Sequence, residues 1–169
     1  MSTLPLIDER GQITPYRLQG RPAPATAPRP FNRIAYSAAH VVADARAATD
    51  PWLDCALDWE HTLAYRHHLW SLGLGVAEAM DTAQRGMGMD WPTSRELIRR
   101  TLAEARHVPG ARVASGCGTD HLVLEDVHTL DQVIRAYDEQ IEAIETLGGQ
   151  LIIMRSEEHT SELQSHSFI

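Results

Sequence analysis

The chain of 169 residues contains no lysine, since all fifteen of its basic residues are arginine. Nothing structural forbids lysine at so many surface positions, so we interpret its absence as the codon bias of a GC-rich genome. The absence has a chemical consequence, because Schiff-base catalysis needs a primary amine on a side chain. We therefore expect this chain to carry out no Schiff-base chemistry by itself.

Cysteine and long hydrophobic runs are scarce as well. Cys55 and Cys117 are too few for a disulfide framework, which favours a reducing compartment. No apolar run approaches the roughly 18 residues that a membrane-spanning helix needs, and Met1 to Glu9 lack the features of a signal peptide. These absences predict a cytoplasmic protein. The net charge of −8 argues against nucleic acid or an anionic membrane as a partner.

The first thirty residues differ from the rest. Two short alternating runs, 4–8 and 12–18, flank Glu9-Arg10-Gly11 and predict a small β-hairpin. Residues 20–30 hold four prolines and no periodic apolar pattern, which predicts an extended connector. We assign residues 1–30 to this hairpin and connector.

From Phe31 to Met154, short apolar runs alternate with amphipathic segments. The alternation implies parallel βαβ units and an α/β fold. Capping patterns mark the predicted helix starts, because Asp and Thr accept hydrogen bonds from the free N–H groups of a first turn. The predicted strands are 33–39, 75–80, 111–115 and 151–154, and the three helices are predicted to begin at Asp50-Pro51, at Thr93 with Glu96, and at Thr129 with Gln132.

Two architectures fit this order, an open doubly wound sheet and a closed eight-stranded barrel. No GxGxxG motif follows the first predicted strand, which argues against a dinucleotide-binding sheet. The repeat of about forty residues scales to roughly 300 for eight units, within the range of barrels. We therefore predict that residues 31–154 form the N-terminal half of a (β/α)8 TIM barrel, with about four strands and three helices.

Polar residues gather where the predicted strands end, which is where barrels place their reacting groups. We interpret this set as candidate substrate-binding residues: Ser37, His40, Glu78, Asp81, Thr82, Gln84, Arg85, Gly116, Gly118, Thr119, Asp120 and His121.

Several of these residues have a structural interpretation that stays open beside the functional one. A carboxylate inside an apolar strand is costly unless it is paired, so Glu78 is equally a site residue or half of an ion pair with an arginine. Arg85 could bind a substrate carboxylate or phosphate, or lock its loop through Glu78. Asp81 and Thr82 could cap a local turn. The glycine loop 116–121 could bind an anion through its N–H groups, with Cys117 as a small loop residue.

The segments AYSAAHVVAD (35–44), GLGVAEAMDTAQRGMGMDWPTSRELIRR (73–100) and VASGCGTDHL (113–122) resemble a bacterial family of dihydrodipicolinate-synthase-like proteins, grouped with class I aldolase barrels such as N-acetylneuraminate lyase. The resemblance covers about 4–154 and is most specific at AEAMDTAQRG. It implies pyruvate-like substrates, no cofactor, and a Schiff-base lysine and a tyrosine on strands after Met154. Thr82 is loosely comparable to the family's loop for the oxo-acid carboxylate, and 114–119 is similar to its glycine-threonine region.

Residues 155–166, RSEEHTSELQSH, resemble the in-frame translation of a short-read sequencing adapter. The segment has no helical or strand periodicity. We therefore interpret 155–169 as a non-native tail and expect the chain to be a fragment of a longer barrel protein.

Three functions follow as alternatives. In the first, the intact protein is a carbon–carbon lyase or aldolase acting on a small oxo-acid, and the fragment alone is inactive and self-associates through open barrel edges. In the second, it is a metal-assisted isomerase or aldolase, since nitrogen and oxygen ligand types suited to a divalent ion occur at His40, Glu78, Asp81, Asp120 and His121. In the third, it is a binding protein on a barrel scaffold.

Overall fold

The computed structural model of the chain describes residues 3–18, 20, 31–50, 53–86, 88–123 and 126–154. The expected connector, apart from Gly20, and the expected tail over 155–169 lie outside these residues. No helix within the described ranges is long and apolar enough to cross a membrane.

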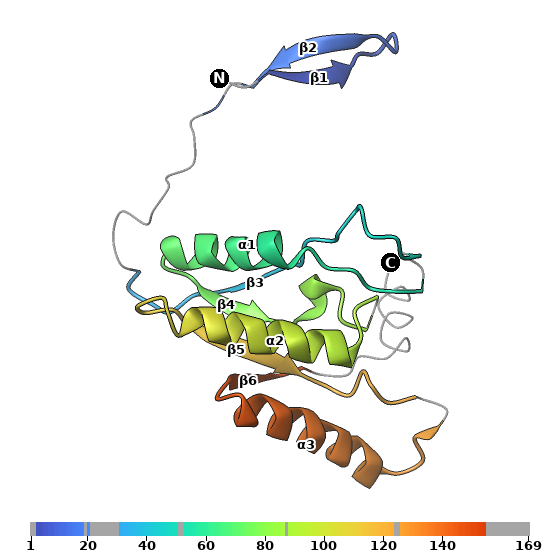
Figure 1. The fold of residues 1–169 in the computed structure, drawn as a ribbon, viewed down its shortest axis with the longest axis vertical. Coiled ribbons are helices and arrows are strands. Elements are labelled where there is room, and N and C mark those ends of the chain that lie inside the picture. The colour runs from blue at the N-terminus through green and yellow to red at the C-terminus, as the bar shows by residue number, and fades with distance from the viewer. Residues whose placement is uncertain are drawn as a thin grey trace, which may run out of the picture.

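The N-terminal hairpin is confirmed. Strands β1 (Thr3–Ile7) and β2 (Ile13–Arg17) pair antiparallel, and every residue of both strands is exposed (Figure 1). The Asp8 carboxylate closes the turn, because its Oδ1 accepts from the N–H groups of Arg10 and Gln12, both at 2.9 Å. Gly11 adopts a φ of 73°, a conformation that glycine takes without strain.

The α/β class is confirmed by a second, larger sheet. Its four strands are parallel and lie side by side in sequence order (Figure 1). A helix connects each strand to the next, as a parallel crossover requires. The strands are β3 (Tyr36–Ala38), β4 (Gly75–Glu78), β5 (Val113–Cys117) and β6 (Gln150–Ile153), and the helices are α1 (Trp59–Ser71), α2 (Trp91–Ala105) and α3 (Leu130–Thr146).

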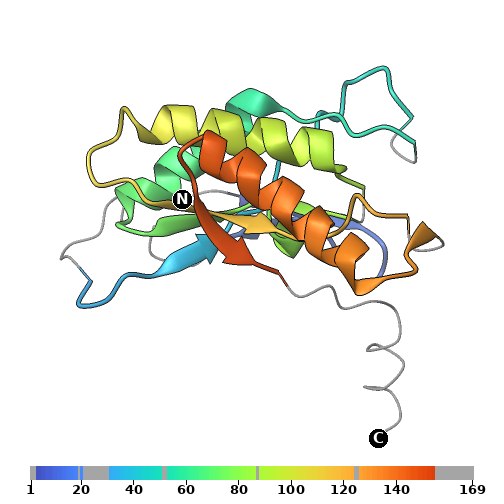
Figure 2. The same cartoon turned by 90° about the horizontal axis from the view of Figure 1, so that it is seen from below.

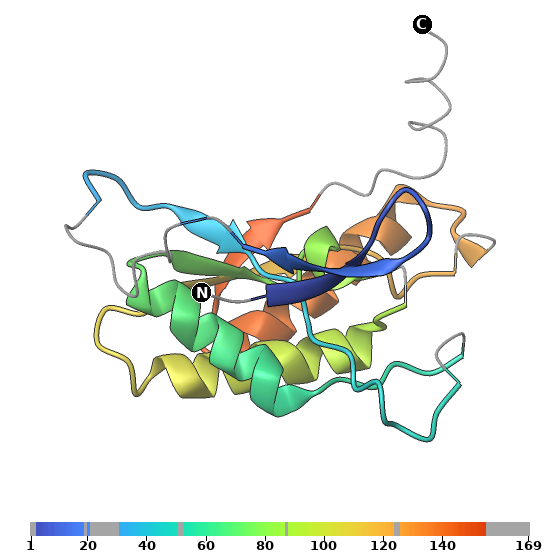
Figure 3. The ribbon, with the colours of Figure 1, turned by 90° about the horizontal axis from the view of Figure 1, so that it is seen from above.

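All three helices cover the same face of this sheet (Figures 2 and 3). Helix α1 packs against β4, α2 against β4 and β5, and α3 against β5 and β6. The core lies between the two layers, where Leu97, Ile98 and Ile144 are almost fully buried. No α-helix in the described part of the chain lies on the other face of the sheet (Figures 2 and 3).

Two of the predicted helix starts are wrong. The first helix begins at Trp59 and not at Asp50-Pro51, because Asp58 is its N-cap and accepts from the N–H of His61 at 3.1 Å. The second begins at Trp91, where Asp90 accepts from the N–H of Thr93 at 2.9 Å. Asp58 lies after the predicted start of the first helix, and Asp90 lies before that of the second. In both helices this aspartate is the N-cap that accepts from the free N–H groups of the first turn.

The supposed capping box at Thr93 fails because Glu96 binds elsewhere. Its carboxylate accepts hydrogen bonds from Arg99 and Arg100, which lower the pKa of Glu96 to about 2. The capping box at Thr129 and Gln132 is confirmed, with both reciprocal hydrogen bonds present.

The third strand runs two residues further than predicted. Gly116 and Cys117 pair with Ile152 and Ile153 of β6, so they belong to the strand and not to a loop. The Cys117 side chain is fully buried against the helices, and this burial raises the pKa of its thiol. Cys117 is therefore a core residue, and its raised pKa disfavours the reactive thiolate.

The larger sheet has open edges at β3 and β6, each of which pairs on one side within the described residues. Ile153 on β6 is 70% exposed. Open edges with exposed apolar side chains promote association between copies. We predict that the chain sediments as an oligomer, and that Ile153→Arg shifts it toward monomer because an edge charge opposes strand pairing.

The matched control is Ile134→Arg, which places the same charge on helix α3 at a residue that is 47% exposed. Sedimentation velocity at several concentrations measures both variants beside the unaltered chain. A monomeric unaltered chain, or an equal effect of the two substitutions, contradicts association through the sheet edges.

Candidate functional site

Glu78, the last residue of β4, forms a buried ion pair with Arg66 of α1. Arg66 Nε donates to Glu78 Oε2 at 3.0 Å, and Arg66 Nη2 donates to Glu78 Oε1 at 2.8 Å. The Thr101 hydroxyl of α2 adds a third hydrogen bond at 2.6 Å. Both charged side chains are fully buried. Of the two interpretations left open for Glu78, the structure shows the ion pair.

The remaining guanidinium nitrogen of Arg66 binds backbone. Its Nη1 donates to the carbonyl of His40 at 2.6 Å and to that of Thr62 at 3.1 Å. Arg66 therefore ties the segment after β3 to helix α1 and strand β4. The His40 ring itself lies at the surface, with its centroid 4.7 Å from that of Tyr65. A buried ion pair is tolerated when its hydrogen-bonding groups are satisfied in this way.

Arg85 forms a second ion pair, with Asp120 from the loop after β5. Arg85 Nε donates to Asp120 Oδ2 at 3.0 Å, and Arg85 Nη2 donates to Asp120 Oδ1 at 2.8 Å. The guanidinium lies over the Trp91 ring, 5.0 Å from its centroid. The alternative that Arg85 locks its loop through Glu78 is wrong, because its carboxylate partner is Asp120. With Arg85 only 4% exposed, its charge is engaged inside the protein.

Arg85 also bridges the ends of two neighbouring strands. Its Nη1 donates to the carbonyl of Ala79 at 3.3 Å and to that of Gly116. Ala79 has a φ of 52°, in the left-handed region that alanine rarely adopts. Its N–H donates to Glu78 Oε1 at 3.0 Å, so the two ion pairs hold this strained residue from both sides. A Cβ on Gly116 would lie 2.8 Å from the Ala79 oxygen, which explains the glycine.

Gln140 of α3 joins the Arg85 network to His121. Its Oε1 accepts from Arg85 Nη2 and from the N–H of Gly118 at 2.8 Å. Its Nε2 donates to Asp120 Oδ1 at 3.1 Å and lies 2.7 Å from His121 Nδ1. Because Gln140 presents a donor, Nδ1 is the acceptor, and the proton of the neutral imidazole lies on Nε2.

Asp120 is the charged acceptor at the centre of this network. Burial raises the pKa of Asp120, but the hydrogen bonds and positive charge of Arg85, helped by Gln140, outweigh it and hold the pKa below the ordinary value of 3.8. Asp120 is therefore ionised at neutral pH. The Gly118 N–H that was a candidate for anion binding is already bound to Gln140.

The other predicted site residues take no part in the two ion pairs. Asp81 and Thr82 form a 3-10 turn, η1 (Asp81–Ala83), that is separated from the end of β4 by two residues, and both are exposed. Gln84 is exposed with a φ of 62°. Ser37 is half-buried on β3, and Thr119 is buried. The accessible polar groups at this edge of the sheet are thus those of η1, Gln84 and His40, together with the exposed part of Asp120.

The five candidate metal ligands are not brought together. Within the described residues, no group of three His, Cys, Asp or Glu side chains is placed to hold a metal ion. The Glu78 carboxylate is occupied by Arg66 and Thr101, and that of Asp120 by Arg85. The structure therefore adds no support to the metal-assisted alternative.

Sequence reasoning missed Arg66 and Gln140. Each lies on a buried helical face, four residues from other buried positions, as in Thr62–Arg66 and Ala136–Gln140–Ile144. A long polar side chain within a stripe of this spacing indicates a buried polar contact. The pattern could have identified both residues, although not their partners.

Residues 4–166 match a family described as "Protein of unknown function (DUF993)". No curated protein matches the chain.

The Arg66–Glu78 pair generates a stability prediction. Arg66→Met leaves a buried carboxylate without its cation, and breaking a buried pair on one side costs about 3–5 kcal/mol of unfolding free energy. Arg66→Met combined with Glu78→Leu removes both charges, so we expect it to recover part of that loss. Denaturant unfolding followed by circular dichroism measures these differences.

Arg99→Met is the matched control, because Arg99 pairs with Glu96 on the exposed side of α2. We expect it to leave stability nearly unchanged, since exposed pairs contribute little. A loss for Arg66→Met no greater than that for Arg99→Met contradicts a structural role for the buried pair.

Proposed function

The chain belongs to the DUF993 family, and from the arrangement of its sheet and loops we propose that it supplies the first strands of a β/α barrel. The complete barrel is a carbon–carbon lyase or aldolase that acts on a small oxo-acid. The reaction proceeds through a Schiff-base lysine that lies on a later strand, outside this chain, because the chain has no lysine of its own.

The strand order carries the barrel part of the proposal. Strands β3 to β6 are adjacent in sequence order, and all three helices lie on one face. In a doubly wound sheet the order of the strands reverses once, and helices cover both faces. In a barrel the strands follow in sequence order, and every helix lies outside. Open edges at β3 and β6 are where further strands would pair to close it.

The lyase part rests on the resemblance at 77–86 and on the polar groups after β4. Barrel enzymes bind substrate at the carboxyl ends of their strands. Thr82 lies there, exposed on η1, at the position loosely comparable to the carboxylate-holding loop of the oxo-acid lyases. We assign its hydroxyl to the substrate carboxylate. The buried ion pairs of Arg66 and Arg85 hold the strand ends and loops that frame this position.

Borohydride trapping tests the proposal on a protein in which this chain is followed by the later strands. The lysine amine attacks the carbonyl carbon of pyruvate, water leaves, and hydride reduces the resulting imine to a stable secondary amine. We expect mass spectrometry to find this adduct on one lysine of a later strand. A protein that forms no borohydride-dependent adduct contradicts the lyase function.

Thr82→Val tests the residue assignment in the same protein. Loss of one hydroxyl hydrogen bond to a charged carboxylate should raise KM for the oxo-acid by about tenfold. Thr146→Val is the matched control, because Thr146 ends α3 and is exposed. Equal KM values for the two variants would remove Thr82 from the substrate site while leaving the trapping result to stand.

A further inference from the structure

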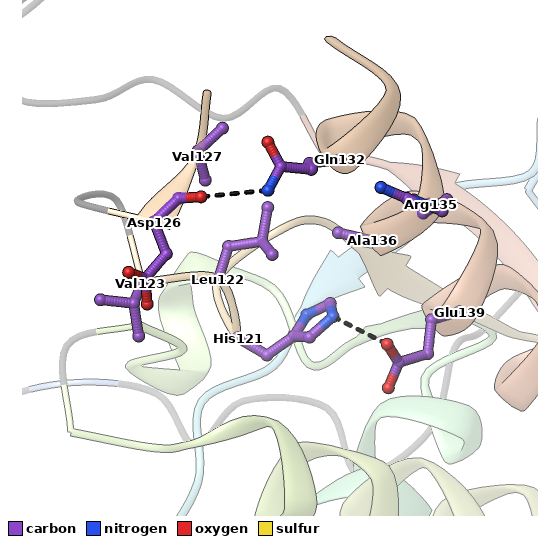
Figure 4. A pocket seen from close by; sticks show the side chains of 9 residues that line it. All are labelled: His121, Leu122, Val123, Asp126, Val127, Gln132, Arg135, Ala136 and Glu139. Atoms are coloured by element: carbon purple, nitrogen blue, oxygen red, sulfur yellow. Dashed lines mark hydrogen bonds and ion pairs between the residues drawn. The ribbon is translucent and has the colours of Figure 1, made fainter. Parts of the chain in front are cut away.

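A pocket of about 400 Å³ opens between the loop after β5 and the N-terminal half of α3 (Figure 4). The pocket is largely open to solvent, and its volume is within the range of small-molecule sites. His121 belongs both to this pocket and to the Arg85 network. The walls are formed by His121, Leu122 and Val127 of the loop and by Arg135, Ala136 and Glu139 of the helix.

His121 presents a donor without an acceptor. Its Nδ1 is bound by Gln140, so Nε2 carries the proton. Nε2 is buried and has no hydrogen-bond partner among the described residues. Glu139 Oε2 lies 3.3 Å from Nε2, within ion-pair distance but without the alignment of a hydrogen bond (Figure 4). An unsatisfied buried donor is costly, so an oxygen that accepts from it is favoured.

Arg135 brings a positive charge to the same pocket. Within the described ranges it makes no ion pair, although Glu139 lies one turn further along α3. A guanidinium binds a carboxylate through two parallel N–H groups. Arg135 and His121 therefore offer donors from two different walls (Figure 4).

The remaining walls select the rest of the ligand. Leu122, Val127 and Ala136 suit a short hydrocarbon chain. The carboxylates of Asp126 and Glu139 also line the pocket, and they repel a ligand with two negative charges about twice as strongly as a ligand with one. The Glu139 side chain is 65% exposed, so it can turn into water and leave its place beside His121 to another carboxylate.

We propose that this pocket binds a small monocarboxylate with a short apolar chain. Its carboxylate lies between the Arg135 guanidinium and His121 Nε2–H, in place of the Glu139 carboxylate. The site does not rest on the proposed lyase activity, because binding here needs neither turnover nor a later strand.

Calorimetric titration of the complete 169-residue chain with isovalerate tests the proposal, and isovaleramide is the uncharged probe of the same shape. We expect saturable binding of isovalerate and binding of isovaleramide that is weaker by about tenfold or more, since a charged hydrogen bond contributes at least that factor. Arg135→Gln should weaken the binding of isovalerate by a similar factor. Arg99→Gln, which removes an exposed arginine of α2, should leave that binding unchanged.

Glu139→Gln should raise the affinity for isovalerate, which Arg135→Gln lowers. It removes the competing carboxylate, so isovalerate should bind several-fold more tightly, whereas Glu142→Gln removes an exposed charge from the same helix and should have no such effect. Inorganic phosphate should fail to displace isovalerate. Equal binding of acid and amide, no saturable binding in the millimolar range, an unchanged affinity in Arg135→Gln or Glu139→Gln, or displacement by phosphate would overturn the assignment.

Discussion

The guanidinium of Arg85 holds together three parts of the chain that are far apart in the sequence, namely the end of β4, the end of β5 with its loop, and helix α3. It binds the carbonyl of Ala79 after β4, the carbonyl of Gly116 on β5, the carboxylate of Asp120 in the next loop and the amide of Gln140 on α3. Because a guanidinium carries five N–H donors in one plane, a single side chain can satisfy acceptors from all of these segments. The carboxyl edge of the sheet depends on this residue for the position of its loops.

Two consequences follow from that position. Ala79 keeps a left-handed backbone because Glu78 binds its N–H and Arg85 its carbonyl, so the two ion pairs meet at one residue. The second consequence concerns Gln140. Its side-chain oxygen accepts from Arg85 and from the N–H of Gly118, so its side-chain nitrogen faces His121. The orientation of an amide on α3 thereby decides which imidazole nitrogen is available to a ligand.

The order of strands and helices could be predicted from the sequence because the hydrophobic period and the Thr129 capping box are local features. The ion-pair partners could not. Arg85 was the arginine that the sequence indicated for Glu78, and only the folded packing of α1 on β4 brings Arg66 to that carboxylate instead. The end of β5 was misplaced because glycine usually indicates a turn, whereas Gly116 is needed for the close approach of the Ala79 oxygen.

Nitrogen-15 NMR of histidine-labelled chain tests most directly whether Arg85 and Gln140 determine the state of His121. The two ring nitrogens give distinct shifts according to which of them carries the proton, and comparison with a His121→Asn variant assigns the signals. The account predicts that His121 carries its proton on Nε2 while Nδ1 is unprotonated, and that Gln140→Leu removes the preference for this tautomer. A proton on Nδ1 in the unaltered chain would mean that the Gln140 amide is reversed, and would contradict the network centred on Arg85.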